Sequence, residues 1–512
     1  MTQEAGGGTV ARGMYHLFLG NTTSTLLMAI TSIFIARFLG PDRYGLYSIA
    51  ILPVSYLMVI SGLGISTAAT RFPAKYIGEG NEKEASSFVL SMTAFQGIIA
   101  VLLAILTLPL SSAVASFLNR PALASLIPLV LAGFVGQALY TTVTAGYQGL
   151  GRMDRSASLQ VILAASKLVI SVSLVLAGLA VTGALIGYSS SYVLTGVVGV
   201  AAVVAMCRRL RLGRFYADVK VAMHYAFPLY AGSLIGGFLG PIQGTLLAHF
   251  TTNVNIGGYG AASNISTLIT LFVYPIGTAL FPLFSRLADD RAVLAATYKT
   301  TVKYATLFVA PVTMLLMALC VPVSQAVYGR AYAFSATYLL LVVSPNLFVG
   351  FGWISQGALL NAMGRTRKTL IVGIVSSAAS FAASFALVVP FGVYGVILAG
   401  MAGSITSLIV AWWMISGELG TNVEVSDVFR IYLASAGAAL LVFPVTYLPL
   451  HPILVTLLGG VAYLLLFFPL LSVFKAVTRE EVTALQGYFG KTGPFLLFLR
   501  FAVRYYDLFA RD

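Results

Sequence analysis

Charged side chains are scarce in this sequence. Asp, Glu, Lys and Arg make up 9% of the 512 residues and 59% of the residues are hydrophobic, giving a mean hydropathy of +0.93. In soluble domains about a quarter of the residues are charged, so the solvent for most of this chain is lipid. The apolar runs are about 20 residues long and do not alternate strictly, and backbone hydrogen bonds in hydrocarbon must close within the segment. We therefore expect membrane-spanning helices and not a barrel.

Cysteine is nearly absent as well. Cys207 and Cys320 lie far apart in the chain and belong to no His/Cys cluster, which excludes a disulfide framework and a zinc site. No metal ion, cofactor or redox chemistry is expected. The N-terminal stretch lacks a signal-peptide core and a cleavage site, and the first apolar run carries Asn21 and Ser24. We expect this run to be a retained first helix.

Hydropathy predicts an all-α polytopic membrane protein with about fourteen transmembrane helices. The expected spans are 15–37, 45–67, 86–109, 123–146, 157–178, 183–206, 225–249, 257–283, 302–322, 336–360, 369–389, 393–415, 430–449 and 453–474. The expected organisation is an N-lobe over 1–206, a basic cytoplasmic connector over 207–223, a C-lobe over 224–415, two further spans in 416–474 and a cytoplasmic tail over 475–512.

The distribution of basic residues predicts the orientation. With the N-terminus inside, 25 of the 30 Lys and Arg residues fall on inner segments, and the four outer ones are Arg37, Arg43, Arg120 and Arg330. Cytoplasmic loops carry such an excess, so both termini are expected in the cytoplasm. Basic loops beside an anionic inner leaflet also explain the net charge of +14 without nucleic acid. In the tail, the spacing from Arg500 to Arg511 predicts an interfacial amphipathic helix.

The two blocks of six spans look like copies of each other. At an offset of 212 residues, ARFLGPDRYGLYS from Ala36 aligns with AHFTTNVNIGGYG from Ala248. The same offset pairs Gly183 with Gly395, and an offset of 213 pairs Gly151 with Gly364. Repeats with an even number of spans lie parallel in the membrane. The sequence therefore predicts two pseudo-symmetric six-helix lobes around a central cavity.

Four features together resemble the polysaccharide transporter branch of the multidrug/oligosaccharidyl-lipid/polysaccharide flippase superfamily. They are the segment ARFLGPDRYGLYSIA, the segment GLGISTAATRFPAKYIGEG, the turn GLGRMDR and the plan of six, six and two spans. The resemblance implies alternating access and a cargo of oligosaccharide on a polyprenyl phosphate or pyrophosphate, for surface polysaccharide or glycoprotein glycan assembly. It also implies contact with membrane lipids and with glycosyltransferases or a polymerase of the same pathway.

Lys167 is the most informative single residue. It lies near the middle of the span 157–178, about 15 Å from either interface. A lysine at that depth costs about 2.5 to 3.5 kcal/mol, and no acidic residue falls inside any predicted span. We expect Lys167 to line the central cavity and to bind the substrate phosphate. The alternative is a lysine held neutral or hydrogen-bonded by neighbours such as Gln160; the equivalent position in the second copy is Ser380.

Further candidates are cationic or polar residues of the predicted spans. Arg37 and Arg71 lie at span ends and are expected to meet the phosphate, although such arginines also anchor helices to headgroups. The polar side chains that could bind sugars are Asn21, Gln137, Gln243 and Asn264. The same groups could instead join helices, with hydrogen bonds worth about 0.6 kcal/mol.

Three alternative functions differ in the residues that they need. A multidrug or toxin antiporter would use carboxylates inside the lobes, whereas all 16 acids here fall in expected loops or tails. A lipid II flippase would share fourteen helices and a cationic cavity. A glycosyltransferase or polymerase would need acids in a large outer loop, but Asp42 is the only acid expected outside. No phosphate-binding loop is present either, so the chain is not expected to be an enzyme.

Overall fold

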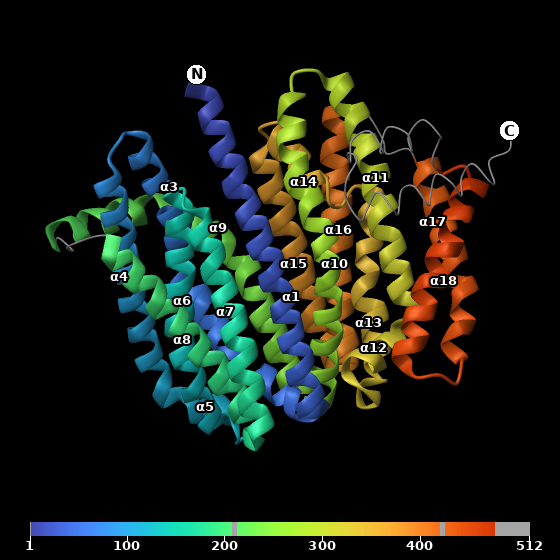
Figure 1. Cartoon of the computed structure of the whole chain (residues 1–512), viewed down its shortest axis with the longest axis horizontal. Helices are drawn as coiled ribbons and strands as arrows, with labels where there is room; N and C mark the ends of the chain where they lie inside the picture. Colours follow the sequence, from blue (N-terminus) through green and yellow to red (C-terminus); the bar gives the residue numbers. More distant parts are fainter. Residues whose placement is uncertain (1, 207–211, 420–424, 477–512) are drawn as a thin grey trace. The chain divides into compact units, whose positions relative to one another are not determined.

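The computed structural model describes residues 2–206, 212–419 and 425–476. Within these ranges every regular element is a helix, as Figure 1 shows. The all-α prediction is therefore confirmed, and the apolar composition of the helices makes the chain a multi-pass membrane protein. The prediction of an amphipathic helix in the tail lies outside the described residues.

The helices run through most of the chain with short breaks. In chain order they are α1 (Thr2–Ala50), α2 (Leu52–Gly62), α3 (Ile65–Gly78), α4 (Glu82–Thr107), η1 (Leu108–Leu110), α5 (Ser111–Phe117), α6 (Leu123–Gly149), α7 (Met153–Leu174), η2 (Val175–Leu179), α8 (Ala180–Met206), α9 (Leu212–Phe250) and α10 (Asn253–Arg286). They continue with α11 (Arg291–Ala318), α12 (Cys320–Tyr328), η3 (Arg330–Tyr332), α13 (Ser335–Val343), η4 (Ser344–Phe351), α14 (Gln356–Ala362), α15 (Thr366–Phe391), α16 (Val393–Leu419), α17 (Val425–Val442), η5 (Phe443–Tyr447) and α18 (Pro452–Val473).

Ten helical stretches of the described chain are long and apolar enough to cross a membrane, or up to eleven if Ser335–Phe351 and Gln356–Ala362 form one bent span. Two of the ten, Tyr15–Gly62 and Met153–Met206, are 48 and 54 residues long, about twice the length that a bilayer needs. Met153–Met206 holds two of the expected spans, and Tyr15–Gly62 holds one and most of a second. α10, where one span was expected, is not among the ten. The exact number fourteen is not confirmed and stays a prediction.

Both long stretches are interrupted at a glycine. Gly40 in α1 has φ 73° and is followed by Pro41. Glycine tolerates this left-handed backbone conformation, and proline has no N–H to donate to the helix, so the helix is interrupted here. Gly178, with φ 91°, interrupts the second stretch. These breaks lie between pairs of expected spans, where a chain that re-enters the membrane has to turn.

The connector expected at 207–223 is largely helical. Its residues from Leu212 onward belong to α9, while 207–211 lie outside the described residues. Asp218 lies on this helix with 5% of its surface exposed, and its Oδ2 accepts a 2.7 Å hydrogen bond from Ser91 Oγ on α4. The expectation that all acids lie in loops is therefore wrong for Asp218. The charged and polar residues of the connector are compatible with helix, and hydropathy does not detect helices that extend beyond the membrane.

The chain divides into two compact units. Unit 1 is Met1–Gly260 with Val388–Val393, and unit 2 is Ala261–Leu387 with Tyr394–Asp512. The two lobes expected at 1–206 and 224–415 stay a prediction.

In unit 1, α6 packs along α8, α7 packs against both α1 and α8, and α3 and α4 cover α6. Small residues allow the closest approaches. A Cβ on Gly136 of α6 would meet the backbone of Tyr192 and Val193 at 2.5 Å, and one on Gly187 of α8 would collide with Ser171 of α7. Helix interfaces in membranes use small residues in this way. As a result α6 and α7 both pack closely against α8, and side chains of the three helices lie near one another.

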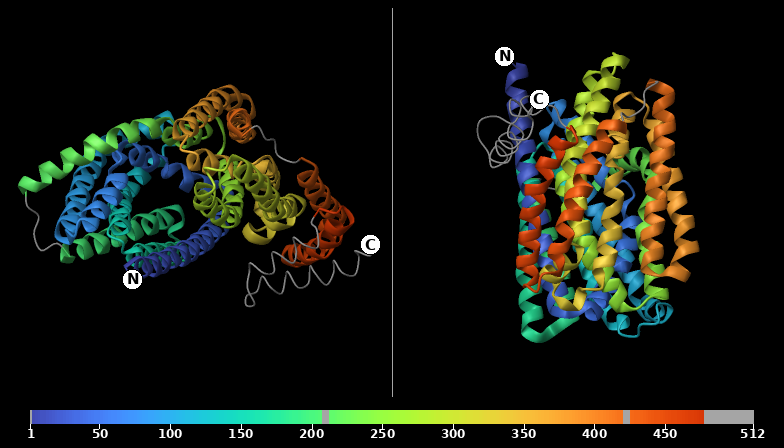
Figure 2. Two further views of the ribbon diagram at one scale, coloured as in Figure 1. Left: turned by 90° about the horizontal axis from the view of Figure 1, so that it is seen from above. Right: turned by 90° about the vertical axis from the view of Figure 1, so that its right-hand side faces the viewer.

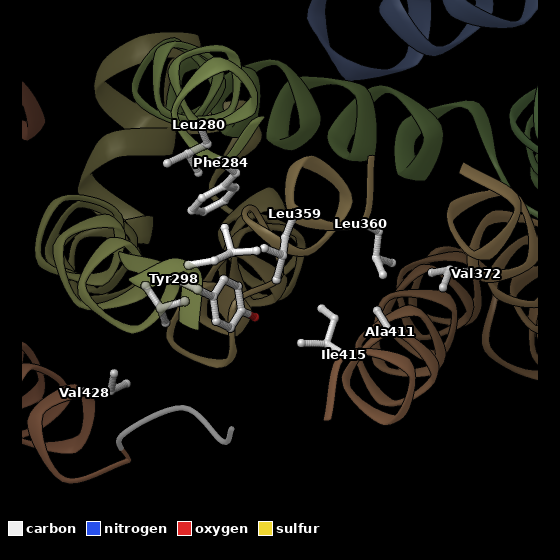
Figure 3. Packing of buried hydrophobic residues seen from close by; sticks show 11 residues of the cluster. Leu280, Phe284, Tyr298, Leu359, Leu360, Val372, Ala411, Ile415 and Val428 are labelled. Carbon is white, nitrogen blue, oxygen red and sulfur yellow. The ribbon is translucent and has the colours of Figure 1, made fainter. Parts of the chain in front are cut away.

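In unit 2, a hydrophobic cluster joins α10, α11, α14, α15, α16 and α17. Figure 3 shows Phe284 and Tyr298 beside Leu359, with Ile415 and Ala411 on α16 nearby. α11 packs on α17, and α17 packs on α18; Figure 2 shows α17 and α18 side by side at the C-terminal end of the described chain.

Candidate functional site

Lys167 on α7 lies against an aromatic ring. Its Nζ is 5.0 Å from the centroid of the Tyr188 ring, which belongs to α8. The ring presents its negative face to the ammonium group, an attraction of roughly 2 kcal/mol where water is excluded. Lys167 is half-buried, and it forms no ion pair with a carboxylate of the described residues. Its positive charge is therefore held by a neutral partner.

Tyr188 also fixes a second candidate residue. Its hydroxyl donates a 2.7 Å hydrogen bond to Oε1 of Gln137 on α6. One tyrosine thus joins Lys167 of α7 to Gln137 of α6, and the close packing at Gly136 and Gly187 makes this possible. Because the bond uses the oxygen of Gln137, the amide NH₂ of that side chain can still donate to another group.

More tyrosines extend this cluster within unit 1. The Tyr192 ring lies 4.9 Å from Tyr188 in an edge-on arrangement, and Tyr140 lies 6.1 Å from Tyr192. On α1, Tyr44 stacks on Tyr47 at 5.9 Å, and Tyr47 interacts electrostatically with Tyr188 and Tyr192. We define the tyrosine cluster as Tyr44, Tyr47, Tyr140, Tyr188 and Tyr192. Tyr140 and Tyr192 are half-buried, so part of the surface of each residue stays accessible.

The sequence did not single out these tyrosines, because aromatic residues are ordinary components of apolar spans. One signal was available. A tyrosine within a span carries a hydroxyl that needs a hydrogen-bond partner, so Tyr140, Tyr188 and Tyr192 indicate polar positions inside two of the expected spans.

The other predicted site residues lie on α1, α3, α9 and α10. The guanidinium of Arg71 on α3 lies 3.9 Å from the ring centroid of Tyr225 on α9. Arg37 and Asn21 are exposed on α1, and Gln243 is half-buried on α9. Asn264 lies on α10 in unit 2. Two of the seven candidates, Lys167 and Gln137, are thus joined through Tyr188.

Arg120, between α5 and α6, holds the turn from α9 to α10. Its Nε donates to Oδ1 of Asn253 at 2.6 Å, its Nη2 to the carbonyl of Thr251 at 2.7 Å, and its Nη1 to the carbonyl of Ala248. The last carbonyls of a helix have no donor within the helix, so these bonds complete the end of α9. Partial burial lowers the pKa of Arg120 and the nearby Asp42 opposes that shift. The sequence identified Arg120 only as an outer cation.

A family model described as Polysaccharide biosynthesis protein matches residues 10–288. The chain belongs to this family. The match runs from within α1 to the end of α10, and it includes the whole of the tyrosine cluster, Lys167 and Gln137. The resemblance seen in the sequence is confirmed.

Two curated relatives are similar to this chain over most of its length. The succinoglycan biosynthesis transport protein ExoT of Rhizobium meliloti is 24% identical over 407 residues, covering 73% of this chain and 76% of the relative. The probable flippase AglR of Haloferax volcanii is 21% identical over 500 residues, covering 93% and 99%. Both names describe transporters and neither describes an enzyme.

Solved structures share the fold. The lipid II flippase MurJ in an inward closed conformation matches with a TM-score of 0.73 and 15% identity, covering 90% of this chain and 98% of that one. An inward-facing multidrug resistance transporter of the MATE family matches with a TM-score of 0.63 and 17% identity, covering 77% and 94%. At these identities the likeness shows the fold alone, which is that of polytopic MurJ-like and MATE-like proteins.

Proposed function

We propose that this protein is a flippase that moves a polyprenyl-(pyro)phosphate-linked oligosaccharide across the cytoplasmic membrane by alternating access. In this proposal both termini lie in the cytoplasm. The two six-helix lobes that the sequence repeat predicts enclose the cavity through which the cargo moves. The names of ExoT and AglR, a transport protein and a probable flippase, support this class of activity. The observation that carries the proposal is the position of Lys167 beside Tyr188.

A cation with a neutral partner suits a phosphorylated cargo. A carboxylate paired with Lys167 would compete with the incoming phosphate and would have to be displaced. The ring of Tyr188 holds the ammonium in place but leaves the full positive charge. The lysine can therefore bind a phosphate oxygen while keeping its ring contact, and the amide of Gln137 and the hydroxyls of Tyr140 and Tyr192 supply hydrogen bonds for sugar hydroxyls.

The depth of Lys167 explains why the site serves translocation. An ammonium near the middle of α7 is tolerated only where it faces water or a partner. We infer that the accessible side of the tyrosine cluster faces a hydrated passage while the prenyl chain stays in lipid. A passage of this kind lowers the free energy of moving a charged headgroup through the membrane. Glycosyltransferases or a polymerase that make or use the cargo are the expected partners.

The test is translocation of a short lipid-linked oligosaccharide in proteoliposomes that contain the native protein, Lys167→Ala or Lys167→Arg at equal incorporation. We expect at least a tenfold loss with alanine and partial activity with arginine, because arginine retains the charge and the ring contact. Lys83→Ala, at an exposed position on α4, is the matched control and should behave like the native protein. Equal activity of the native protein and Lys167→Ala would refute the role of Lys167.

The similarity in fold to MATE and MurJ suggests two alternative cargoes, organic cations and lipid II. Assays in the same proteoliposomes distinguish them from a lipid-linked oligosaccharide. Accumulation of organic cations under a sodium or proton gradient, without movement of the lipid-linked oligosaccharide, would identify an antiporter. Movement of lipid II in preference to other lipid-linked saccharides would identify a lipid II flippase. The proposal requires that the lipid-linked oligosaccharide moves and that organic cations do not accumulate.

A further inference from the structure

Unit 2 contains a pair of consecutive helices that meet at an angle. Ser335–Phe351 and Gln356–Ala362 are bent by 43° relative to each other, and we call them, with residues 352–355 between them, the bent span. Before the break the chain forms η4, a 3₁₀ helix of eight residues. Such helices seldom exceed three or four residues, and within a longer helix they often mark a hinge. At the break Gly352 has φ 86°, a left-handed conformation that suits glycine.

The hydroxyl of Tyr432, on α17, bonds to the backbone of η4. It accepts a 3.0 Å hydrogen bond from the N–H of Gly350 and donates to the carbonyl of Leu347. These two backbone groups are three residues apart and are the pair that a 3₁₀ helix joins directly. A side chain that inserts between backbone partners is one of the identified causes of a helix bend. Tyr432 therefore supports the bend from a neighbouring helix.

Close packing gives the hydroxyl access to the backbone. A Cβ on Gly350 would collide with the side chains of Tyr432 and Val428, which lie one turn apart on α17. Because glycine has no side chain, α17 can approach η4 here. At the start of α17, Oδ2 of Asp427 lies 2.8 Å from Nζ of Lys303 on α11, and α11 packs on both η4 and α17. The position of Tyr432 is thus linked to the packing of α17 on α11.

The other side of the break is held by Tyr298 of α11. A Cβ on Gly352 would collide with the Tyr298 hydroxyl, and the side chain of Tyr298 is hydrogen-bonded to that of Gln356, the first residue of α14. Figure 3 shows Tyr298 beside Leu359 of α14 in the hydrophobic cluster. α11 therefore contacts the bent span after the break, while α17 bonds to it before the break. The angle of the span depends on both helices.

We propose that the bent span is a two-state element and that Tyr432 sets its angle. With the hydroxyl bonded to η4, the span is bent as in this structure. When α17 moves away, the N–H of Gly350 bonds to its own helix alone and the span straightens, because a buried backbone N–H must stay paired. α17 is the first span after the predicted C-lobe, so it acts as a brace on a span of that lobe. The use of this change in translocation rests on the proposed function, whereas the two states do not.

The test measures the angle by pulsed electron paramagnetic resonance on the full chain in detergent. Spin labels are attached to Val293→Cys on α11 and to Arg367→Cys on α15, five residues after α14, both at exposed positions; Cys207→Ala and Cys320→Ala remove the native thiols. The native span should give one main distance. In Tyr432→Phe we expect a second population shifted by several ångströms. Turning α14, about 11 Å of helix, through 43° moves its end by about 8 Å.

Two further variants make the result specific. Gly350→Ala displaces the Tyr432 hydroxyl from the opposite side and should give the same second distance. Tyr447→Phe removes a hydroxyl from a residue of unit 2 that is 76% exposed and should keep the native distance. Native distances in both Tyr432→Phe and Gly350→Ala, or a broad distribution without a second maximum, would overturn the switch. The measurement needs no cargo, so a protein that switches but moves no lipid-linked oligosaccharide would refute the proposed function and leave the switch in place.

Discussion

The ring centroid of Tyr188 lies 5.0 Å from Nζ of Lys167, and the hydroxyl of the same residue lies 2.7 Å from Oε1 of Gln137. The ring and the hydroxyl of one side chain therefore serve two different neighbours. Substitutions at this position can remove one contact while the other is retained, which gives a direct measure of each.

Tyr188→Phe and Tyr188→Leu separate the two contacts. Phenylalanine keeps the ring beside Lys167 and loses the hydrogen bond to Gln137, so we expect about a threefold loss of translocation rate, since such bonds are worth about 0.6 kcal/mol in membranes. Leucine also removes the ring, and the loss of a desolvated cation–π contact should reduce the rate about 30-fold. Initial rates in proteoliposomes measure both effects.

Tyr216→Leu is the control for these variants, because Tyr216 is 72% exposed on α9. If the phenylalanine and leucine variants were equally impaired, the hydroxyl and not the ring would be the important part of Tyr188. Thermal unfolding of each purified variant shows whether a lower rate reflects a less stable protein.

Close packing at Gly257 leads to a second prediction. A Cβ on this residue of α10 would collide with the carbonyl oxygen of Pro41, next to the break in α1. We expect Gly257→Ala to destabilise the protein by about 1 to 3 kcal/mol, because two backbones would have to separate. Gly373→Ala is the matched helical control, since nothing lies within 4 Å of its added Cβ. A midpoint of thermal unfolding for Gly257→Ala equal to that of the control would contradict the close contact.

The sequence predicts the helical class well because hydropathy and backbone hydrogen bonding determine it locally. The break at Gly40 and Pro41 can likewise be predicted from two residues. The extension of α9 through Asp218 could not, because a polar amphipathic helix outside the membrane leaves no hydropathy signal. Local helix propensity and tertiary packing determine whether this segment is helical.

The candidate site shows the same limit. Lys167 stands out in the sequence because a charge in a span is costly by itself. The choice of Gln137 among several polar residues depends on Tyr188, and hence on how α6, α7 and α8 pack at Gly136 and Gly187. A single sequence shows the residues but not which helices are neighbours.

Asp218 provides a test of ion coupling. An antiporter would need a carboxylate that takes up and releases a cation during transport, and Asp218 is a buried acid of unit 1. We expect Asp218→Asn to translocate the lipid-linked oligosaccharide within about threefold of the native rate, because an asparagine Oδ1 can still accept from Ser91. Rates are compared with and without proton and sodium gradients. A gradient-dependent rate in the native protein that disappears in Asp218→Asn would show coupling through this residue.

Arg120→Gln tests the turn between α9 and α10. The native guanidinium bonds to Asn253 and to the carbonyls of Ala248 and Thr251, and a glutamine amide can replace at most two of these bonds. Hydrogen bonds from charged donors are worth about 1.5 to 3 kcal/mol each, so we expect a loss of about 3 kcal/mol in unfolding free energy and a lower midpoint of thermal unfolding. Arg120→Lys should be impaired almost as much, because a single ammonium cannot reproduce the planar set of donors. Arg330→Gln, at an exposed arginine, controls for the loss of one positive charge. If Arg120→Lys had the native midpoint while Arg120→Gln did not, charge alone would stabilise the turn and the geometry of the guanidinium would be unimportant.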